Sequence, residues 1–155
     1  MTIYLVRHAK AGDRASWPGD DFLRPLSRRG QIQAEAFVEQ FADRHVDRLL
    51  SSPYIRCMES LVPLGGIRRI PIEPVDAITE GASLEDALTL VRKHAHHDAV
   101  LCSHGDVIPM LLEHYAARGV DLGTNPVCPK GCTWVLEIDG AQDVVSATYI
   151  APPTE

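Results

Sequence analysis

The stretch TIYLVRHAKAG, residues 2–12, begins with an apolar run and then sets an arginine beside a histidine. The run from Ile3 to Val6 has the length and composition of a buried strand, so Arg7 and His8 stand where that strand should end. Polar side chains at the end of a buried element need partners from other parts of the chain. What this strand end does must therefore follow from the segments that meet it.

The composition predicts a single soluble domain over residues 1–155. A chain of 155 residues is long enough to bury a core without disulfide or metal support, and its hydrophobic share of 45% and charged share of 23% are ordinary for a globular protein. The formal net charge of -6 argues against a broad nucleic-acid-binding face, which would need many lysines and arginines. We therefore expect no nucleic-acid partner.

The sequence also bears on compartment and cross-linking. Arg7 and His8 interrupt the N-terminal apolar run before it reaches the length of a signal peptide or a membrane span, so we expect a cytoplasmic protein with no membrane partner. The four cysteines are few for a disulfide framework in a chain of this length, and we interpret them as thiols. Nothing in the pattern indicates an oligomeric state.

Strands and helices alternate along the rest of the sequence. Helices are predicted over residues 27–44 and 54–64, from 83 through 91, and around 108–115, and strands at 46–51, 99–103, 133–138 and 144–150, with an edge or irregular strand at 70–75. The last two strands are expected to pair antiparallel. This alternation indicates an α/β layered domain with a mostly parallel sheet flanked by helices, whose ligands gather at the carboxyl ends of the strands.

The pattern of the first strand end occurs again later in the chain. The segment AVLCSHGD also ends an apolar run in a histidine, His104, and in a parallel sheet it would lie at the same edge as His8. The segment LLSSPYIRCMES ends a strand at Ser51 and brings Arg56 back over that edge from the first turns of a helix. The segment VDAITEGAS adds one carboxylate, Glu80, before a glycine.

Two histidines, two arginines and a carboxylate suit a transferring phosphoryl group. A neutral imidazole can attack phosphorus, while guanidinium groups hold phosphate oxygens in bidentate fashion. We therefore expect the loss of Arg7 or Arg56 to be severe. A carboxylic acid near the phosphate can protonate the leaving atom; Glu80 is the best candidate for this general acid, and Asp106 is the alternative.

These segments resemble a known family. LVRHAKAG, SSPYIRCMES and LCSHGDV are similar, in order and approximate spacing, to the three core motifs of the histidine phosphatase superfamily, the phosphoglycerate-mutase-like enzymes. Within it, DDFLRPLSRRG resembles the small SixA-type phosphohistidine phosphatases. The resemblance implies a three-layer sandwich without a large inserted subdomain and a phosphatase that needs no metal or cofactor. It also implies that His8 is the nucleophile, with Arg7, Arg56 and His104 around the phosphate.

The substrate expected from this resemblance is a phosphohistidine protein or a small phosphomonoester. We count Gly105, Lys10 and Arg24 as further substrate-binding candidates, and Lys130 lies in another segment that could hold a second phosphate. The chain also resembles the phosphatase domain fused behind a Nudix hydrolase in some bacterial proteins, at RHAKAG, VIP and KGCTWVL. That likeness indicates a nucleotide or nucleoside polyphosphate as the alternative substrate. SixA-type enzymes can lack a carboxylate at the position of Glu80. The presence of this residue therefore bears on whether the substrate is a phosphohistidine protein or a phosphate ester.

Two hypotheses of other classes stay open at this point. One is a non-catalytic module that binds a phosphorylated ligand. The other is a metal hydrolase built on His94, His96 and His97, or on the pair Cys128 and Cys132. We favour the interpretation without a metal, because the cysteines have no second close pair and the histidines fit the solvated end of a helix.

Overall fold

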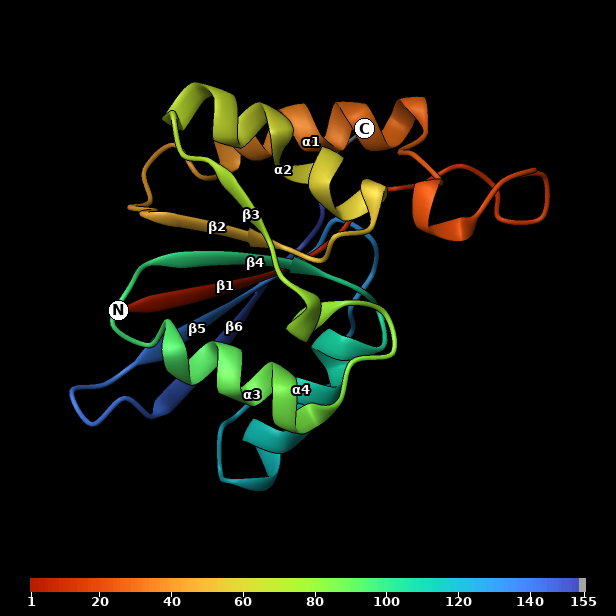
Figure 1. Ribbon diagram of the computed structural model, residues 1–155. Helices are drawn as coiled ribbons and strands as arrows, with labels where there is room; N and C mark the ends of the chain where they lie inside the picture. The colour runs from red at the N-terminus through yellow and green to blue at the C-terminus, as the bar shows by residue number, and fades with distance from the viewer. Residues whose placement is uncertain (154–155) are drawn as a thin grey trace.

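The strand that opens the sequence lies in the middle of a six-stranded sheet in the computed structural model, which describes residues 1–153 (Figure 1). The strand order is β3-β2-β4-β1-β5-β6; the first four strands run parallel, β5 is antiparallel to β1, and β6 is antiparallel to β5. The strands are β1 (Thr2–Arg7), β2 (Arg48–Ser51), β3 (Ile72–Pro74), β4 (Ala99–Ser103), β5 (Thr133–Ile138) and β6 (Val144–Ile150). The helices are α1 (Arg28–Gln40), α2 (Ile55–Arg68), α3 (Leu84–Lys93) and α4 (Val107–Ala117), with 3-10 turns η1 (Asp21–Leu23) and η2 (Asp76–Ile78).

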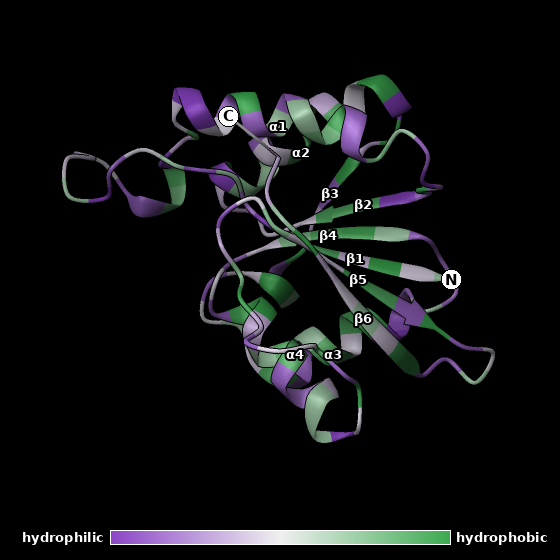
Figure 2. Cartoon of the chain, turned by 180° about the vertical axis from the view of Figure 1, so that it is seen from behind, coloured by the Kyte–Doolittle hydropathy of each residue, from purple (hydrophilic) through white to green (hydrophobic). Residues whose placement is uncertain are grey.

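Helices cover both faces of the sheet, so the central strands are buried on both sides. Helices α1 and α2 lie on one face, and α3 and α4 lie on the other (Figure 1). Alternate residues of β1 serve the two layers: Ile3 and Leu5 pack with α3 and α4, while Tyr4 and Val6 pack with α1 and α2. Strands buried in this way read as continuous apolar runs, and they appear hydrophobic in Figure 2. The predicted α/β three-layer fold with a mostly parallel sheet is confirmed.

Most predicted elements have close to their predicted bounds. The predicted strands at 99–103, 133–138 and 144–150 are β4, β5 and β6, and β5 pairs antiparallel with β6 as expected. The predicted edge strand is β3, which lies at the end of the sheet beside β2. Helix α2 is longer than predicted and continues past Pro63 to Arg68, because Leu64 is buried in the core and Gly65 lies against Leu49 of β2. Tertiary packing here outweighs the proline, whose usual effect is to end a helix.

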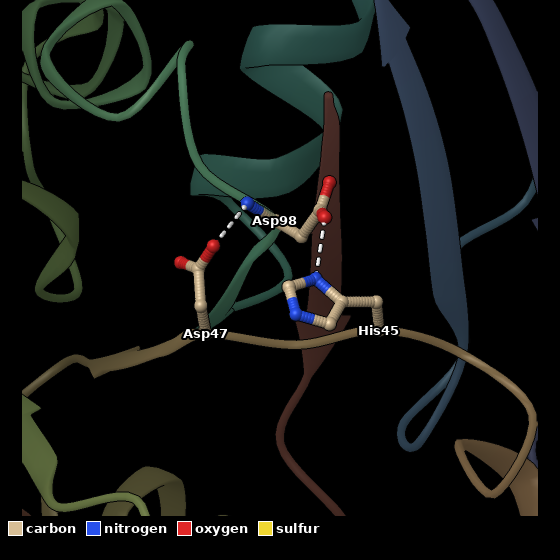
Figure 3. Close-up of side chains that lie close together, drawn as sticks. All are labelled: His45, Asp47 and Asp98. Carbon is tan, nitrogen blue, oxygen red and sulfur yellow. Dashed lines mark hydrogen bonds and ion pairs between the residues drawn. The ribbon is translucent and has the colours of Figure 1, made fainter.

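Charged side chains tie together the amino ends of the central strands (Figure 3). Nδ1 of His45 lies 2.7 Å from Oδ2 of Asp98, and the N–H of Asp98 donates to the Asp47 carboxylate at 3.2 Å. The second carboxylate oxygen of Asp98 accepts the N–H of Thr2 at 2.9 Å. Asp98 therefore joins the start of β1 and β4 to the segment that leads into β2. Within residues 1–153, no helix is long and apolar enough to cross a membrane.

Candidate active site

The candidate site lies at the opposite edge, where the parallel strands end. Strand β4 pairs with β1 and β2 in a register that brings the last residues of all three strands level. His8, Ser52 and His104 directly follow these strand ends. The imidazole rings of His8 and His104 lie 5.5 Å apart, centroid to centroid, in an edge-to-face arrangement. The structure thus brings together the two histidines that the sequence assigns to one edge.

The surroundings of His8 select one tautomer of its ring. Its Nδ1 lies 2.8 Å from the carbonyl oxygen of Ala9, which can only accept a hydrogen bond. Nδ1 therefore carries the proton and Nε2 keeps its lone pair. His8 is only 4% exposed, and this burial, with smaller effects from His104, Arg56 and Arg7, lowers the pKa of His8 to about 3, although the hydrogen bond to Ala9 acts in the opposite direction. The ring is consequently neutral and nucleophilic at neutral pH.

This lowered pKa makes the stability of the fold depend on pH. The unfolded chain protonates His8 below its ordinary pKa of 6.5, while the folded protein resists protonation down to a pKa of about 3, so stability is lost as the pH falls through this window. As the pH is lowered, we expect the free energy of unfolding of the wild type to decrease more steeply than that of His8→Gln. The difference in slope should be about 1.4 kcal/mol per pH unit. Urea unfolding followed by circular dichroism between pH 7 and pH 4 measures this difference. Parallel pH profiles for the two proteins would contradict the buried neutral ring.

The guanidinium of Arg7 is held close to the backbone around it. One terminal nitrogen donates to the carbonyl of Cys128 at 2.6 Å, while the buried Nε has no hydrogen-bond partner among residues 1–153. Gly105 makes this placement possible, because a Cβ added there would lie 2.6 Å from the central guanidinium carbon of Arg7. Arg7 therefore keeps a donor free for an anion, and Gly105 contributes by the absence of a side chain.

Arg56 is almost completely buried, with 1% of its surface exposed, and is oriented by Asp21. Its two terminal nitrogens donate to the carbonyl and the carboxylate of Asp21 at 2.9 and 3.2 Å. The guanidinium also lies over the ring of Tyr54, 4.8 Å from its centroid. Its Nε is the second buried arginine donor without a hydrogen-bond partner in the described chain. A bound anion that accepted hydrogen bonds from these Nε groups would satisfy both donors.

Glu80 lies beside Arg56 and is held there by its loop. One carboxylate oxygen lies 3.4 Å from Arg56 and 3.4 Å from Arg14. Gly81, in the left-handed region with a φ of 82°, donates its N–H to the Asp106 carboxylate at 2.8 Å. Asp106, the alternative acid, thus positions the loop that presents Glu80.

The second histidine contacts residues that the sequence analysis did not single out. Nε2 of His104 lies 2.8 Å from the hydroxyl of Ser52 and 3.5 Å from the sulfur of Cys57. The ring of Tyr54 packs edge-to-face on the imidazole, with centroids 4.9 Å apart. His104 is 2% exposed, so these contacts determine its orientation. Ser52 follows the end of β2, and that position is the signal from which it could have been inferred.

Arg24 and Lys10, which were also predicted to bind substrate, form hydrogen bonds to other groups of the protein. Arg24 is buried, and its guanidinium bonds to the Asp21 carboxylate at 2.9 Å and to the carbonyl of Gly12. Asp21 therefore connects two arginines, and the hydrogen bond from Arg24 and the charge of Arg56 lower the pKa of its carboxyl group. The backbone of Lys10 bonds to Gln33 at 3.0 Å at the edge of the site. Asp21 was missed by sequence analysis because its role depends on Arg56, which lies 35 residues away in the sequence.

The histidines and the cysteine pair considered as metal ligands in the sequence analysis lie in different parts of the fold. Cys128 and Cys132 lie at the carboxyl edge of the sheet, whereas His94 caps the end of α3 before β4 begins at the opposite edge. His94 is also buried, being 8% exposed, which differs from the expected solvated helix end. The two edges are about 20 Å apart, which is the length of β1. At the edge opposite the candidate site, the described residues contain one trio whose possible metal-ligand atoms lie within 4.8 Å of one another: His45, Asp47 and Asp98 (Figure 3).

Comparison with known proteins agrees with this geometry. The 8-oxo-(d)GTP phosphatase of Mycolicibacterium smegmatis is 34% identical over an alignment of 160 positions, which covers 99% of this chain and 49% of that protein. The chain therefore spans about half the length of this curated relative. The solved structure of the protein named as phosphohistidine phosphatase SixA in Nakamurella multipartitia matches with a TM-score of 0.76 and 22% identity, over 99% of this chain and 96% of that one. Its counterpart in Agrobacterium tumefaciens matches with a TM-score of 0.72 and 27% identity, over 97% of each chain.

The family match covers the first half of the chain. The family model described as histidine phosphatase superfamily (branch 1) matches residues 3–86, which include the first two of the three predicted motifs. The SixA-type likeness and the compact core without a large insertion are confirmed by the solved structures that match over nearly the whole chain. The family match agrees with the predicted hydrolase class. The chain belongs to the histidine phosphatase superfamily, branch 1.

Proposed function

We propose that the protein is a metal-independent phosphatase that forms a covalent phosphohistidine on Nε2 of His8. The observation that carries this proposal is the buried His8 ring, which burial keeps unprotonated beside two guanidinium groups while its Nδ1–H donates to the Ala9 carbonyl and leaves Nε2 with its lone pair. A module that only binds phosphate gains from a positively charged histidine. A neutral ring with a free lone pair serves a nucleophile instead.

The reaction takes place in two steps. Arg7 and Arg56 hold the non-bridging phosphate oxygens while Nε2 of His8 attacks phosphorus and the bond to the leaving group breaks. Glu80 gives a proton to the leaving atom. Water then attacks the phosphohistidine, Glu80 takes a proton from it, and phosphate leaves. During the intermediate, the Ala9 carbonyl stabilises the positive charge on the ring through its bond to Nδ1–H.

The first candidate substrate is a phosphohistidine protein or a small phosphomonoester. The structural likeness to the two proteins named as SixA, one of them 27% identical, supports this class. The second candidate is a nucleotide or nucleoside polyphosphate, which the 34% identity to an 8-oxo-(d)GTP phosphatase supports.

The cations around the site favour a substrate with more than one phosphate. Burial lowers the pKa of Lys130, and the charges of Arg7, Arg24, Arg14 and Arg56 lower it further, in that order. A lysine influenced by four arginines lies in a positive region. Asp21 and Glu80 form ion pairs with Arg14, Arg24 and Arg56, so part of this charge is balanced within the protein and the remainder supports a second phosphate group.

Replacing Glu80 with glutamine separates the substrate classes. We expect Glu80→Gln to lower kcat for phosphate esters by about 100-fold or more, because an alkoxide leaving group needs the proton. Hydrolysis of a phosphoamide such as phosphohistidine should fall much less, because its leaving nitrogen can be protonated by solvent. The measurement is steady-state turnover on a phosphohistidine protein, nucleoside mono- and triphosphates, and sugar phosphates.

Asp106→Asn is the matched control, since asparagine keeps an acceptor for the Gly81 N–H while losing the acid. It should retain most of the ester activity. The reverse result, with Asp106→Asn inactive on esters and Glu80→Gln active, would assign the proton to Asp106. Absence of turnover on every substrate by the wild type would refute the proposed activity.

A further inference from the structure

Two cysteine thiols lie in direct contact beside the candidate site. The sulfur atoms of Cys128 and Cys132 are 3.5 Å apart, and both residues are free cysteines. They flank a turn in which the N–H of Cys132 donates to the carbonyl of Pro129 at 3.0 Å and Gly131 takes a φ of 85°. A disulfide has an S–S length of about 2.05 Å, so a movement of about 1.5 Å would join the two sulfurs.

The same turn is bonded to the end of β1. The terminal nitrogen of Arg7 donates to the carbonyl of Cys128 at 2.6 Å, and the backbone N–H of Arg7 donates to the carbonyl of Cys132 at 3.0 Å. Gly131 completes the contact, because its N–H donates to the carbonyls of Arg7 and His8 at 3.1 and 3.0 Å. A change in this turn therefore reaches the guanidinium directly.

The two cysteines differ in freedom to move. Cys132 is fully buried at the start of β5, and its N–H and carbonyl are both bonded as described above. Cys128 is partly exposed and belongs to the long loop between α4 and β5. Joining the sulfurs would therefore displace Cys128 rather than Cys132, and the carbonyl that holds Arg7 would move with it.

The charges at the site also activate the accessible thiol. The hydrogen bond from Cys132 lowers the pKa of Cys128; burial opposes this effect and the positive charge of Arg7 adds to it. The remaining cysteines, Cys57 and Cys102, are 0% exposed. An oxidant in solution should consequently react first at Cys128.

We propose that Cys128 and Cys132 form a reversible disulfide in response to a hydroperoxide, and that this bond inhibits the protein by displacing the carbonyl that positions Arg7. The Cys128 thiolate attacks the peroxide, the O–O bond breaks, and with one proton a sulfenic acid and an alcohol or water are formed. The Cys132 sulfur then attacks the sulfenic sulfur and releases water. The thiol pair loses two electrons and the peroxide gains them. The effect on activity rests on the proposed function, but the formation of the disulfide does not.

The chain provides a direct readout of the bond. Lys130 lies between the two cysteines, so trypsin cleavage after Lys130 leaves the Cys128 and Cys132 peptides joined only if the disulfide is present. We expect hydrogen peroxide to produce this joined pair in mass spectra and dithiothreitol to release it. Over the same time course, kcat/KM for an aryl phosphate should fall by about 100-fold, the cost of misplacing a positioning group by about 1 Å. Dithiothreitol should restore it.

Variants separate this disulfide from other oxidation. The ratio of activity after and before peroxide should rise close to one in Cys128→Ser and in Cys132→Ser, and Cys102→Ala, which keeps the pair, should remain as sensitive as the wild type. Absence of the joined peptides would overturn the proposal, as would joined peptides with unchanged activity, or equal sensitivity of Cys128→Ser. If the reduced wild type is inactive on all substrates, the proposed function fails while the peptide result still decides whether the disulfide forms.

Discussion

Replacing His8 with alanine is expected to lower kcat/KM for an aryl phosphate by about 10⁴- to 10⁶-fold, because the reaction then loses its nucleophile. The arginines would still bind phosphate, so affinity for inorganic phosphate should fall far less than turnover. The prediction depends on the tautomer that Ala9 selects, which leaves Nε2 of His8 able to attack. It is the largest single effect that the structure supports.

The measurement combines turnover with trapping of the intermediate. A quench at alkaline pH preserves a phosphorylated imidazole, and mass spectrometry should then find one phosphoryl group on the peptide that contains His8 in the wild type. His96→Ala is the matched control, since His96 is an exposed histidine before β4 at the opposite edge of the sheet, and it should keep full activity. Normal turnover by His8→Ala, or a phosphoryl group trapped on another residue, would exclude the proposed mechanism.

Replacing Arg56 with alanine should have the second largest effect. The loss of one preorganised donor to the phosphate oxygens lowers kcat by about 10²- to 10³-fold. A second cost arises because Asp21 and Glu80 both lose an ion-pair partner, with contacts of 3.2 and 3.4 Å in the wild type. Arg56→Lys keeps the charge but not the planar fork, so it should recover only part of the lost rate.

Thermal unfolding of the Arg56 variants distinguishes a damaged site from a damaged fold. Arg92→Ala, which removes an exposed arginine from the last turn of α3, is the matched control and should leave both kcat and the melting temperature unchanged. An Arg56→Ala protein that melts like the wild type and retains its kcat would show that Arg56 does not hold the phosphate. A folded variant with the predicted loss would support the assignment.

The residues that the structure brings together could be predicted from local pattern, because each follows an apolar run that forms a strand. His8 and His104 come directly after β1 and β4, and parallel strands in register bring their ends to one edge. Arg56 could be predicted for a similar reason, because it lies in the first turn of the helix that follows β2. The periodicity of each strand and helix is a property of a short segment, and the sequence contains it directly.

The protonation of the site was decided only by tertiary structure. The lowered pKa of His8 arises mainly from its burial in the folded chain, and its tautomer follows from the hydrogen bond to the Ala9 carbonyl. The support of Arg56 by Asp21 and of His104 by Ser52 likewise joins segments 35 and 52 residues apart.

The sequence by itself thus determined which chemical groups reach the edge of the sheet, because strand and helix patterns are local. Only the folded chain decided how those groups are charged, oriented and restrained, as the contact of the Cys128 and Cys132 sulfurs beside Arg7 illustrates. The physical reason is that desolvation and hydrogen-bond geometry depend on every neighbour in space, and most of those neighbours are remote in sequence.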